Sequence, residues 1–171
     1  MILGRRVLVA PVDGALGRRI QAWRETHDPP YAAVMGPHLT LCYQPTPAAS
    51  ELIEAQVRHA LPGPLNINLS TVGELGNRDC TLCIAITETS ELDAARERLF
   101  DGRFVQLEGY RTWRWHVTLV RNGRARDRAA LVAHAARELR VEGERLEMRT
   151  VELLERGPER YEAIGRWLLG A

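Results

Sequence analysis

Short apolar runs with the two-residue period of β-strands alternate along this chain with amphipathic segments of helical period. Capping residues and prolines mark the first two helices, which begin after Asp13 and at Thr46-Pro47 and end at Asp28-Pro29-Pro30 and at Pro62-Gly63-Pro64. Two further helices are predicted over Ser90–Phe100 and Asp127–Leu139. The predicted strands are Val7–Val12, His38–Tyr43, Leu65–Val72, Thr81–Thr87, Trp113–Val120, Arg149–Leu154 and Tyr161–Leu168.

The order strand, helix, strand, helix occurs twice in this pattern. The sequence between the two copies contains no linker and no low-complexity segment. We therefore predict a single domain over residues 1–171, of the α+β class and made of two pseudo-equivalent lobes. A chain of 171 residues with 45% hydrophobic content is long enough to bury the core of such a domain.

The second strand of each copy carries the same short motif, His-apolar-Thr-Leu. The two motifs are His38-Leu39-Thr40-Leu41 and His116-Val117-Thr118-Leu119. Successive side chains of a strand point to opposite faces, so the histidine and the threonine of each motif share one face while the apolar residues point into the core. If the two strands lie side by side, or face each other across a groove, two imidazoles and two hydroxyls converge.

These four groups can cleave a phosphodiester without a metal. The ordinary pKa of imidazole is about 6.5, so near neutral pH one histidine can be neutral while the other is protonated. His38 and His116 then act as a pair, in which one deprotonates the nucleophile and the other protonates the departing ribose oxygen. The hydroxyls of Thr40 and Thr118 can donate hydrogen bonds to the phosphoryl oxygens. The pairing predicts a bell-shaped dependence of rate on pH, with a maximum near neutrality.

Two other interpretations of the motifs have less support. If the motif occurred once, a packing or surface role for its histidine would be favoured. Because the motif occurs twice, a functional role for both histidines is favoured instead. A zinc site needs a third and a fourth ligand at recognisable spacing, and neither motif supplies one. Cys80 and Cys83 have the spacing of half a zinc or redox site, but residues three apart on a strand face opposite ways and the sequence contains no second such pair.

The two motifs, 78 positions apart in a small α+β chain, resemble those of the 2H phosphoesterase superfamily, and in particular its branch of 2′-5′ RNA ligases and cyclic phosphodiesterases. Pro37 before the first motif and Arg121 after the second also fit the pattern of that branch. The resemblance implies two antiparallel sheets with helices outside, around a central groove that carries both motifs, and no cofactor or metal. It implies hydrolysis of 2′,3′-cyclic phosphates to 2′-phosphates, or reversible formation of 2′-5′ linkages.

The resemblance also implies that Arg121 is a phosphate ligand. Strict alternation along the strand, however, puts Arg121 on the face opposite His116, unless the strand ends or bulges there. Beside the first motif, alternation places Cys42 on the face of His38, as a small apolar wall, and places Tyr43 on the core side. Tyr43 remains a candidate substrate-binding residue because an aromatic ring can stack on a base.

Arginines and aromatic residues gather around the second motif. The segment Arg103–Arg128 holds seven arginines and two acidic residues, a local balance of +5 in a chain with a net charge of +1. Arginine binds phosphate, so this segment is a candidate RNA-binding surface with Arg114 and Arg124 among its ligands. The alternative is a solvated loop in which Trp113 and Trp115 pack in the core, where alternation places them.

Other polar and aromatic residues give weaker signals. Arg24 and Tyr31 precede the first motif and could reach the groove, although no pattern in the sequence places them there. The three remaining histidines lie on predicted helices without the motif, and we expect them at the surface or at an edge; they are His27, His59 and His134.

The composition excludes several classes of mechanism. All 23 basic residues are arginine, so the chain cannot form a P-loop or a Schiff base, and it cannot be a ligase that adenylylates a lysine. The balanced charge argues against coating nucleic acid through bulk charge. No stretch is long enough to cross a membrane or to form a signal peptide, and three cysteines do not make a disulfide framework. We expect a cytoplasmic protein with no membrane partner, and a monomer.

The sequence therefore predicts a metal-independent cyclic phosphodiesterase whose partner is RNA with a 2′,3′-cyclic phosphate end. Within enzymes, the alternative is a phosphoesterase acting on a small cyclic nucleotide or a nucleotide-sugar phosphate. From another class, the alternative is a non-catalytic RNA-binding module in which both motifs hold phosphate. The sequence does not determine which histidine is the base and which the acid.

Overall fold

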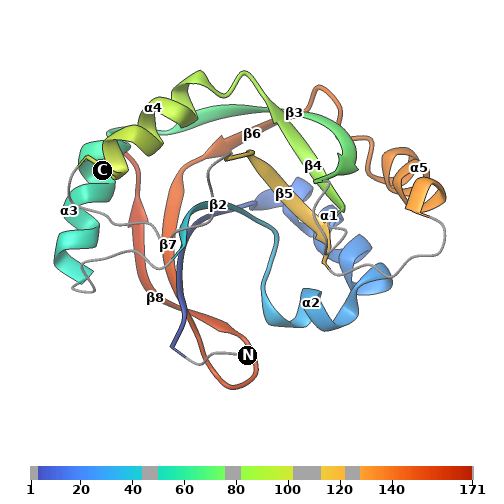
Figure 1. The fold of residues 1–171 in the computed structure, drawn as a ribbon, viewed down its shortest axis with the longest axis horizontal. Helices are drawn as coiled ribbons and strands as arrows, with labels where there is room; N and C mark the ends of the chain where they lie inside the picture. The colour runs from blue at the N-terminus through green and yellow to red at the C-terminus, as the bar shows by residue number, and fades with distance from the viewer. Residues whose placement is uncertain (1–3, 44–49, 76–81, 102–112, 122–127, 171) are drawn as a thin grey trace.

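A computed structural model of the chain describes residues 4–43, 50–75, 82–101, 113–121 and 128–170. Within these ranges, strands and helices alternate through most of the chain (Figure 1). The helices are α1 (Gly14–His27), α2 (Pro29–Val34), α3 (Ser50–Ala60), α4 (Ser90–Leu99) and α5 (Arg128–Leu139). The strands are β1 (Arg6–Pro11), β2 (His38–Tyr43), β3 (Leu65–Glu74), β4 (Leu82–Thr87), β5 (His116–Val120), β6 (Arg145–Met148), β7 (Thr150–Arg156) and β8 (Tyr161–Leu168).

The described strands form one curled antiparallel sheet in the order β6-β3-β4-β5-β2-β1-β7-β8. Its two halves have equivalent strand arrangements, and each half contains one of the two motif strands. The halves meet between β5 and β2, where Val117 pairs with Leu39. The predicted α+β class and the antiparallel pairing are confirmed, and the two predicted lobes are joined by this central pair into a continuous sheet.

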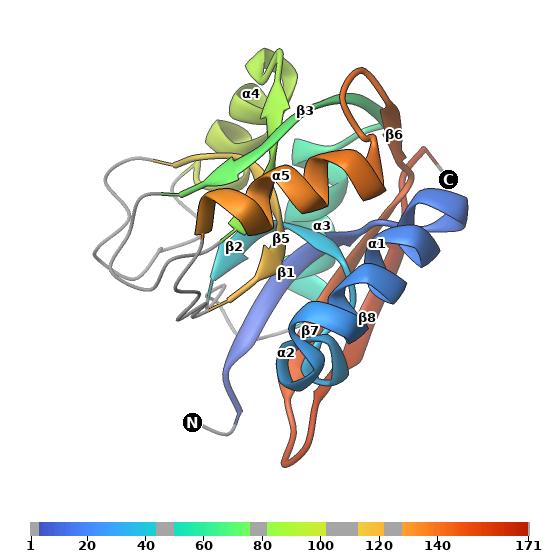
Figure 2. The ribbon, with the colours of Figure 1, turned by 90° about the vertical axis from the view of Figure 1, so that its right-hand side faces the viewer.

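The helices pack outside the sheet, and helices from different halves contact each other. Residues of α1, α3, α4 and α5 contribute to one large buried cluster with side chains from all eight strands. Figure 2 shows α1, which follows β1, beside α5, which follows β5 in the other half. A Cβ atom at Gly17 would lie 1.8 Å from the carbonyl oxygen of Val12, so glycine is needed for α1 to approach the end of β1 this closely.

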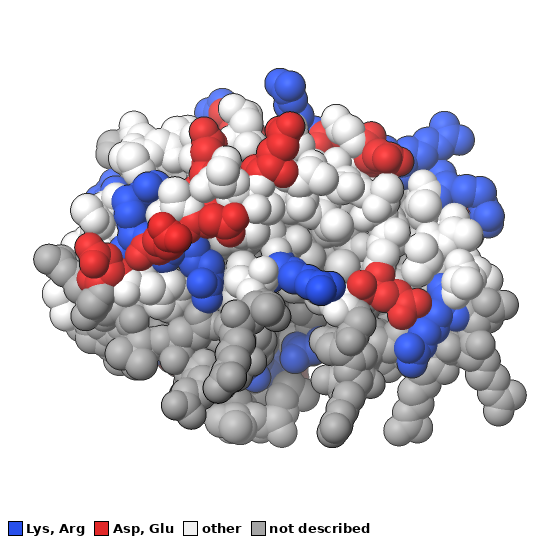
Figure 3. Space-filling view, turned by 45° about the horizontal axis from the view of Figure 1, so that its top comes forward, with Lys and Arg blue, Asp and Glu red and all other residues white. Residues whose placement is uncertain are grey.

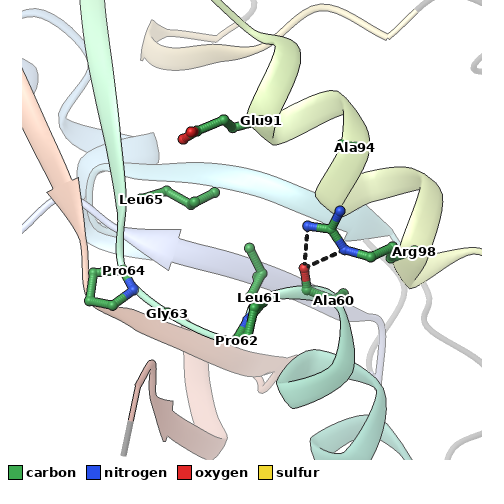
Figure 4. A pocket seen from close by; sticks show the side chains of 9 residues that line it. All are labelled: Ala60, Leu61, Pro62, Gly63, Pro64, Leu65, Glu91, Ala94 and Arg98. Carbon is green, nitrogen blue, oxygen red and sulfur yellow. Dashed lines mark hydrogen bonds between the residues drawn. The ribbon is translucent and has the colours of Figure 1, made fainter.

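On the other side of the molecule, α3 packs against α4 (Figure 4). Arg98 on α4 reaches the end of α3, where its Nε and Nη2 atoms donate hydrogen bonds of 3.0 and 2.9 Å to the carbonyl oxygen of Ala60. This contact satisfies a carbonyl that a helix end leaves without an intrahelical partner. A hollow lined by Pro62, Pro64 and Leu65 lies beside it. None of its lining residues belongs to β2 or β5, so we assign it a packing role.

Most elements agree with the predicted ones, and β2 and β8 have the predicted bounds. Two short elements, α2 and β6, were not predicted. Pro29 and Pro30, which end α1, are also the first residues of α2, where proline is tolerated because the first turn of a helix needs no N–H partner. Asp13 is the N-cap residue of α1 but makes no side-chain capping hydrogen bond. The predicted helix start at Thr46-Pro47 lies outside the described residues.

The surface shown in Figure 3 carries acidic and basic side chains interspersed, in keeping with a net charge of +1. Among the described helices, none is both long enough and apolar enough to span a bilayer.

Candidate active site

The pairing of β2 with β5 brings the two motifs together. Leu39 pairs with Val117 in an antiparallel register, and both side chains are fully buried in the large core cluster. Continuing this register by one residue in each direction places His38 opposite Thr118 and Thr40 opposite His116. Because side chains alternate along a strand, these four lie on the face of the sheet away from Leu39 and Val117. We call this the histidine face.

A β-bulge follows the threonine in each motif. On β1, Leu8 pairs with Cys42 and Val9 with Thr40, so the pairing skips Leu41. On β4, Leu82 pairs with Val120 and Cys83 with Thr118, so the pairing skips Leu119 in the same way. An extra residue reverses the alternation of the residues that follow it.

The bulge in β2 overturns two predictions. Cys42, which strict alternation placed on the histidine face, pairs with Leu8 and is buried in the core cluster with it. Tyr43, which alternation placed on the core side, pairs with Val7 and packs against a smaller apolar cluster that also contains Val9, the strand partner of Thr40. Tyr43 therefore lies on the histidine face, where a substrate-binding residue must be.

The apolar wall predicted for Cys42 is supplied by the other half of the sheet. Cys83 pairs with Thr118, is buried, and lies outside both apolar clusters. Burial raises the pKa of its thiol to about 11, so Cys83 is a neutral, nonpolar neighbour of Thr118 near neutral pH. Cys80, which has the spacing of half a zinc or redox site with Cys83, lies outside the described residues.

The two histidines are anchored in the same manner. The Nδ1 atom of His38 lies 2.7 Å from the carbonyl oxygen of Gly36, and that of His116 lies 2.7 Å from the carbonyl oxygen of Arg114. A carbonyl oxygen can only accept, so each Nδ1 carries the proton and donates. The neutral ring then has its lone pair on Nε2, and the protonated ring has an N–H there. Each imidazole can thus serve as a base or as an acid through Nε2.

The turn before His38 is held at three successive carbonyl groups. Arg24, which is fully buried, donates from Nη2 to the carbonyl oxygen of Met35 at 2.7 Å. His38 donates to that of Gly36, and the backbone N–H of Val12 donates to that of Pro37 at 2.9 Å. These bonds fix the position of the first histidine relative to α1 and β1.

Burial lowers the pKa of both histidines in the free protein. The pKa of His38 falls to about 4, chiefly because burial disfavours the imidazolium. The positive charges of Arg24, His116 and Arg121 act in the same direction, and the hydrogen bond to Gly36 opposes them. Burial also lowers the pKa of His116. An anion bound between the histidines would favour protonation and raise both pKa values again.

Arg121 reaches the histidine face because β5 ends at Val120, just beyond the bulge. Its side chain is exposed and its guanidinium carbon lies 5.6 Å from the ring centroid of Tyr31. The same ring is contacted by Arg24 at 4.9 Å. Both arginines lie close enough to His38 to lower its pKa, so two positive charges border the first motif.

Of the other arginine and aromatic residues around the second motif, the structure describes only some. Arg114 is exposed and stands two residues before His116. Arg124, with most of Arg103–Arg128, lies outside the described residues. Trp115 is buried in the core, as predicted, and Trp113 is half-buried, with its ring centroid 6.0 Å from that of Tyr43.

The histidines outside the motifs were predicted at the surface or at an edge. His59 is exposed, whereas His27 and His134 are half-buried where α1 meets α5, with ring centroids 5.1 Å apart. Within the described part of the chain, no group of three or more histidine, cysteine, aspartate or glutamate side chains could hold a metal ion.

An antiparallel α+β fold with a His-x-Thr motif on each of two paired central strands is typical of the 2H phosphoesterase superfamily. The family model of the 2′-5′ RNA ligase superfamily matches residues 12–158, a range that includes both motifs. The chain therefore belongs to this superfamily of 2H phosphoesterases. A search of curated proteins gives no match.

Solved structures with the same fold cover nearly the whole chain. A crystal structure of E. coli LigT with ATP is 16% identical, covers 100% of both chains and has a TM-score of 0.62. The protein TT0787 of Thermus thermophilus is 18% identical, with 98% of each chain covered and a TM-score of 0.60. A crystal structure described only as a phosphoesterase is also 18% identical, covers 99% of this chain and 100% of its own, and has a TM-score of 0.60.

Proposed function

We propose that this protein hydrolyses the 2′,3′-cyclic phosphate at RNA ends to a 2′-phosphate, with His38 and His116 as its general acid and base. The observation that carries the proposal is the matched anchoring of the two imidazoles. Both rings are on one face of adjacent strands, and both have Nδ1 occupied by a backbone carbonyl 2.7 Å away, which leaves Nε2 for the reaction. Membership of the 2′-5′ RNA ligase superfamily supports the same chemistry.

In the proposed reaction, a water oxygen attacks phosphorus in line with the ribose 3′ oxygen. The P–O bond to water forms as the P–O3′ bond breaks. The neutral histidine takes a proton from the water at Nε2, and the protonated histidine gives its Nε2 proton to O3′. The two rings have then exchanged protonation states, and proton exchange with solvent resets them. The choice of O3′ as leaving group rests on the resemblance to the family.

The other predicted residues bind the substrate in this proposal. The hydroxyls of Thr40 and Thr118 donate hydrogen bonds to the phosphoryl oxygens as charge shifts onto them. Arg121 supplies a positive charge beside the same oxygens. Tyr43 stacks on the base, and Arg114 and Arg124 hold the phosphates of a longer strand. Loss of either threonine hydroxyl should slow the reaction less than loss of either imidazole.

Solved structures of a similar protein support a nucleotide substrate, since crystal structures of E. coli LigT contain ATP, NADP+ or 3′-AMP. The reverse reaction, in which a 5′-hydroxyl replaces water, would join strands through a 2′-5′ bond. Hydrolysis should dominate because water is present at about 55 M, unless the protein also binds the second strand and raises its local concentration. We expect the protein to act as a monomer in the cytoplasm.

The test is an assay of an RNA oligonucleotide with a 2′,3′-cyclic phosphate end, in the presence of EDTA, with identification of the product. A 2′-phosphate end is the expected product, and a DNA strand with a terminal 3′-phosphate should not react. Product with a 3′-phosphate would contradict the regiochemistry, and activity that disappears in EDTA and returns with zinc or manganese would contradict the mechanism. Binding without turnover would favour the RNA-binding module.

A comparison of substrates separates RNA from a small cyclic nucleotide. Arg114→Ala should lower kcat/KM on the oligonucleotide more than on a 2′,3′-cyclic mononucleotide, because only the longer substrate reaches beyond the terminal phosphate. Arg18→Ala, at an exposed arginine of α1, is the matched control. Equal losses on both substrates would contradict an extended RNA-binding surface.

A further inference from the structure

Arg121 must be held in place if it is to bind phosphate, and β5 does not hold it. The strand ends at Val120, and Arg121 follows in a bend with its side chain exposed. An exposed arginine loses up to about 2 kcal/mol of rotamer entropy when it is fixed by a ligand. Contacts that fix the side chain before the ligand arrives remove part of that loss.

The contacts that fix Arg121 come from the other half of the molecule. Its backbone N–H donates to the Oδ2 atom of Asp28 at 2.7 Å, across 93 positions of sequence. Its guanidinium carbon lies 5.6 Å from the ring centroid of Tyr31. Burial raises the pKa of the Tyr31 hydroxyl, and the nearby positive charge of Arg121 opposes that rise. Asp28 is the residue between α1 and α2, and Tyr31 is on α2. The corner between these two helices therefore receives the residue that follows the second motif.

Tyr31 is itself fixed from the side of the first motif. The guanidinium carbon of Arg24 lies 4.9 Å from its ring centroid, and Arg24 is fully buried and bonded to the carbonyl oxygen of Met35. Two guanidinium groups thus contact one aromatic ring, whose electron-rich face attracts both. Contact with this one ring keeps both cations near His38, whose pKa both of them lower. A bound anion would offset the repulsion between them.

We propose that Tyr31 and Asp28 are positioning residues that aim Arg121 at the phosphoryl group bound between the histidines. This inference rests on the proposed function, in which that group is a phosphodiester. Asp28 fixes the backbone of Arg121, and Tyr31 fixes its guanidinium. The α1–α2 corner of one half thereby completes the phosphate site of the other, so the site forms only when both halves are packed together.

The inference can be tested without turnover, by measuring the affinity for inorganic phosphate in a double-mutant cycle of Tyr31→Phe and Arg121→Ala. Tyr31→Phe keeps the ring and removes only the hydroxyl, and we expect it to weaken phosphate binding by about 3- to 10-fold. In the Arg121→Ala background the same change should have almost no effect, because the hydroxyl acts through the arginine. Tyr161→Phe is the matched control, since Tyr161 also carries an arginine on its ring, namely Arg156 at 5.7 Å, and should bind phosphate normally.

Asp28→Asn, which keeps an acceptor oxygen, should weaken phosphate binding less than Asp28→Ala. An NMR titration of His38 in the free protein gives a second measurement. The pKa of His38 should rise in Arg121→Ala, which removes the guanidinium charge, and in Tyr31→Phe, which lets that charge move away from His38. Effects of Tyr31→Phe and Arg121→Ala that are independent, or unchanged phosphate affinity in Tyr31→Phe, would overturn the inference. Since neither measurement involves a cyclic phosphate substrate, failure of the proposed reaction would leave both results intact and would be seen separately in the hydrolysis assay.

Discussion

Leu41 and Leu119 occupy equivalent places in the two halves of the sheet, because each is the residue that strand pairing skips at the end of its motif. The bulges carry Tyr43 and Arg121, two positions further along, to the histidine face. Each motif therefore delivers a third group to the site in addition to its histidine and threonine. The first motif delivers an aromatic ring and the second a guanidinium, so the two halves are alike in geometry but not in chemistry.

The first prediction concerns this guanidinium. Arg121→Ala should lower kcat/KM on a 2′,3′-cyclic mononucleotide by about 10- to 100-fold, the range expected when a charge-assisted hydrogen bond to phosphate is lost. Arg121→Lys should recover part of the loss, since it keeps the charge but not the planar fork. Steady-state kinetics would measure both, with Arg18→Ala as control. A loss below about twofold in Arg121→Ala would remove Arg121 from the phosphate site.

The second prediction replaces the expected optimum near neutrality. In the free protein, burial lowers the pKa of His38 to about 4 and holds that of His116 below its ordinary value of about 6.5. The singly protonated pair is therefore most abundant on the acid side of neutrality, whichever ring holds the proton. As the pH increases, we expect kcat/KM to rise near pH 4, and we expect its descending limb to lie at a pH below 6.5.

The profile of kcat should lie at higher pH than that of kcat/KM. It reports the complex with substrate, in which the phosphodiester anion favours the imidazolium and raises both pKa values. Rate measurements from pH 3.5 to pH 9 at low and at saturating substrate would separate the two profiles. A rate that climbs steadily to pH 9 would contradict a pair of imidazoles and point to a different base.

The third prediction links His38 to stability. Because its folded-state pKa is depressed, the neutral ring contributes stability that is present above pH 6.5 and is lost as the pH falls toward 4. At pH 5 protonation of the unfolded chain lowers the free energy of unfolding by about 2 kcal/mol relative to pH 7. His38→Asn, whose amide can still donate to the carbonyl of Gly36, should lose correspondingly less stability than the wild type between pH 7 and pH 5. Urea unfolding at the two pH values would measure the difference, and identical losses would show that His38 is not buried as a neutral ring.

The sequence was sufficient to predict the parts of the site that depend on local periodicity. The motif strand His38–Tyr43 has the predicted bounds, and the histidine and threonine of each motif share a face because they are two positions apart. The two short elements were missed for local reasons as well. Pro29-Pro30 ends one helix and begins the next, and the strand Arg145–Met148 has only four residues.

The rest of the site depends on contacts between segments far apart in the sequence. A bulge arises from how two strands pair, so alternation within β2 alone gave the wrong side for Cys42 and Tyr43. The corner that receives Arg121 is 93 positions away from it, and no periodicity relates the two. Charge and burial together set the pKa of His38, and both are properties of the packed structure.

The paired-histidine mechanism is tested by the rate at which His38→Asn, His116→Asn and the double variant hydrolyse a 2′,3′-cyclic phosphate under single-turnover conditions. A positioned acid or base contributes about 10²–10⁴-fold, and two groups that act in one step are not additive. Each single variant should therefore lose at least about 10²-fold while its circular dichroism and unfolding transition at pH 7 stay close to those of the wild type, and the double variant should be hardly slower than the slower single variant. Activity within about twofold of wild type in either single variant, in a protein that remains folded, would contradict the paired-histidine mechanism.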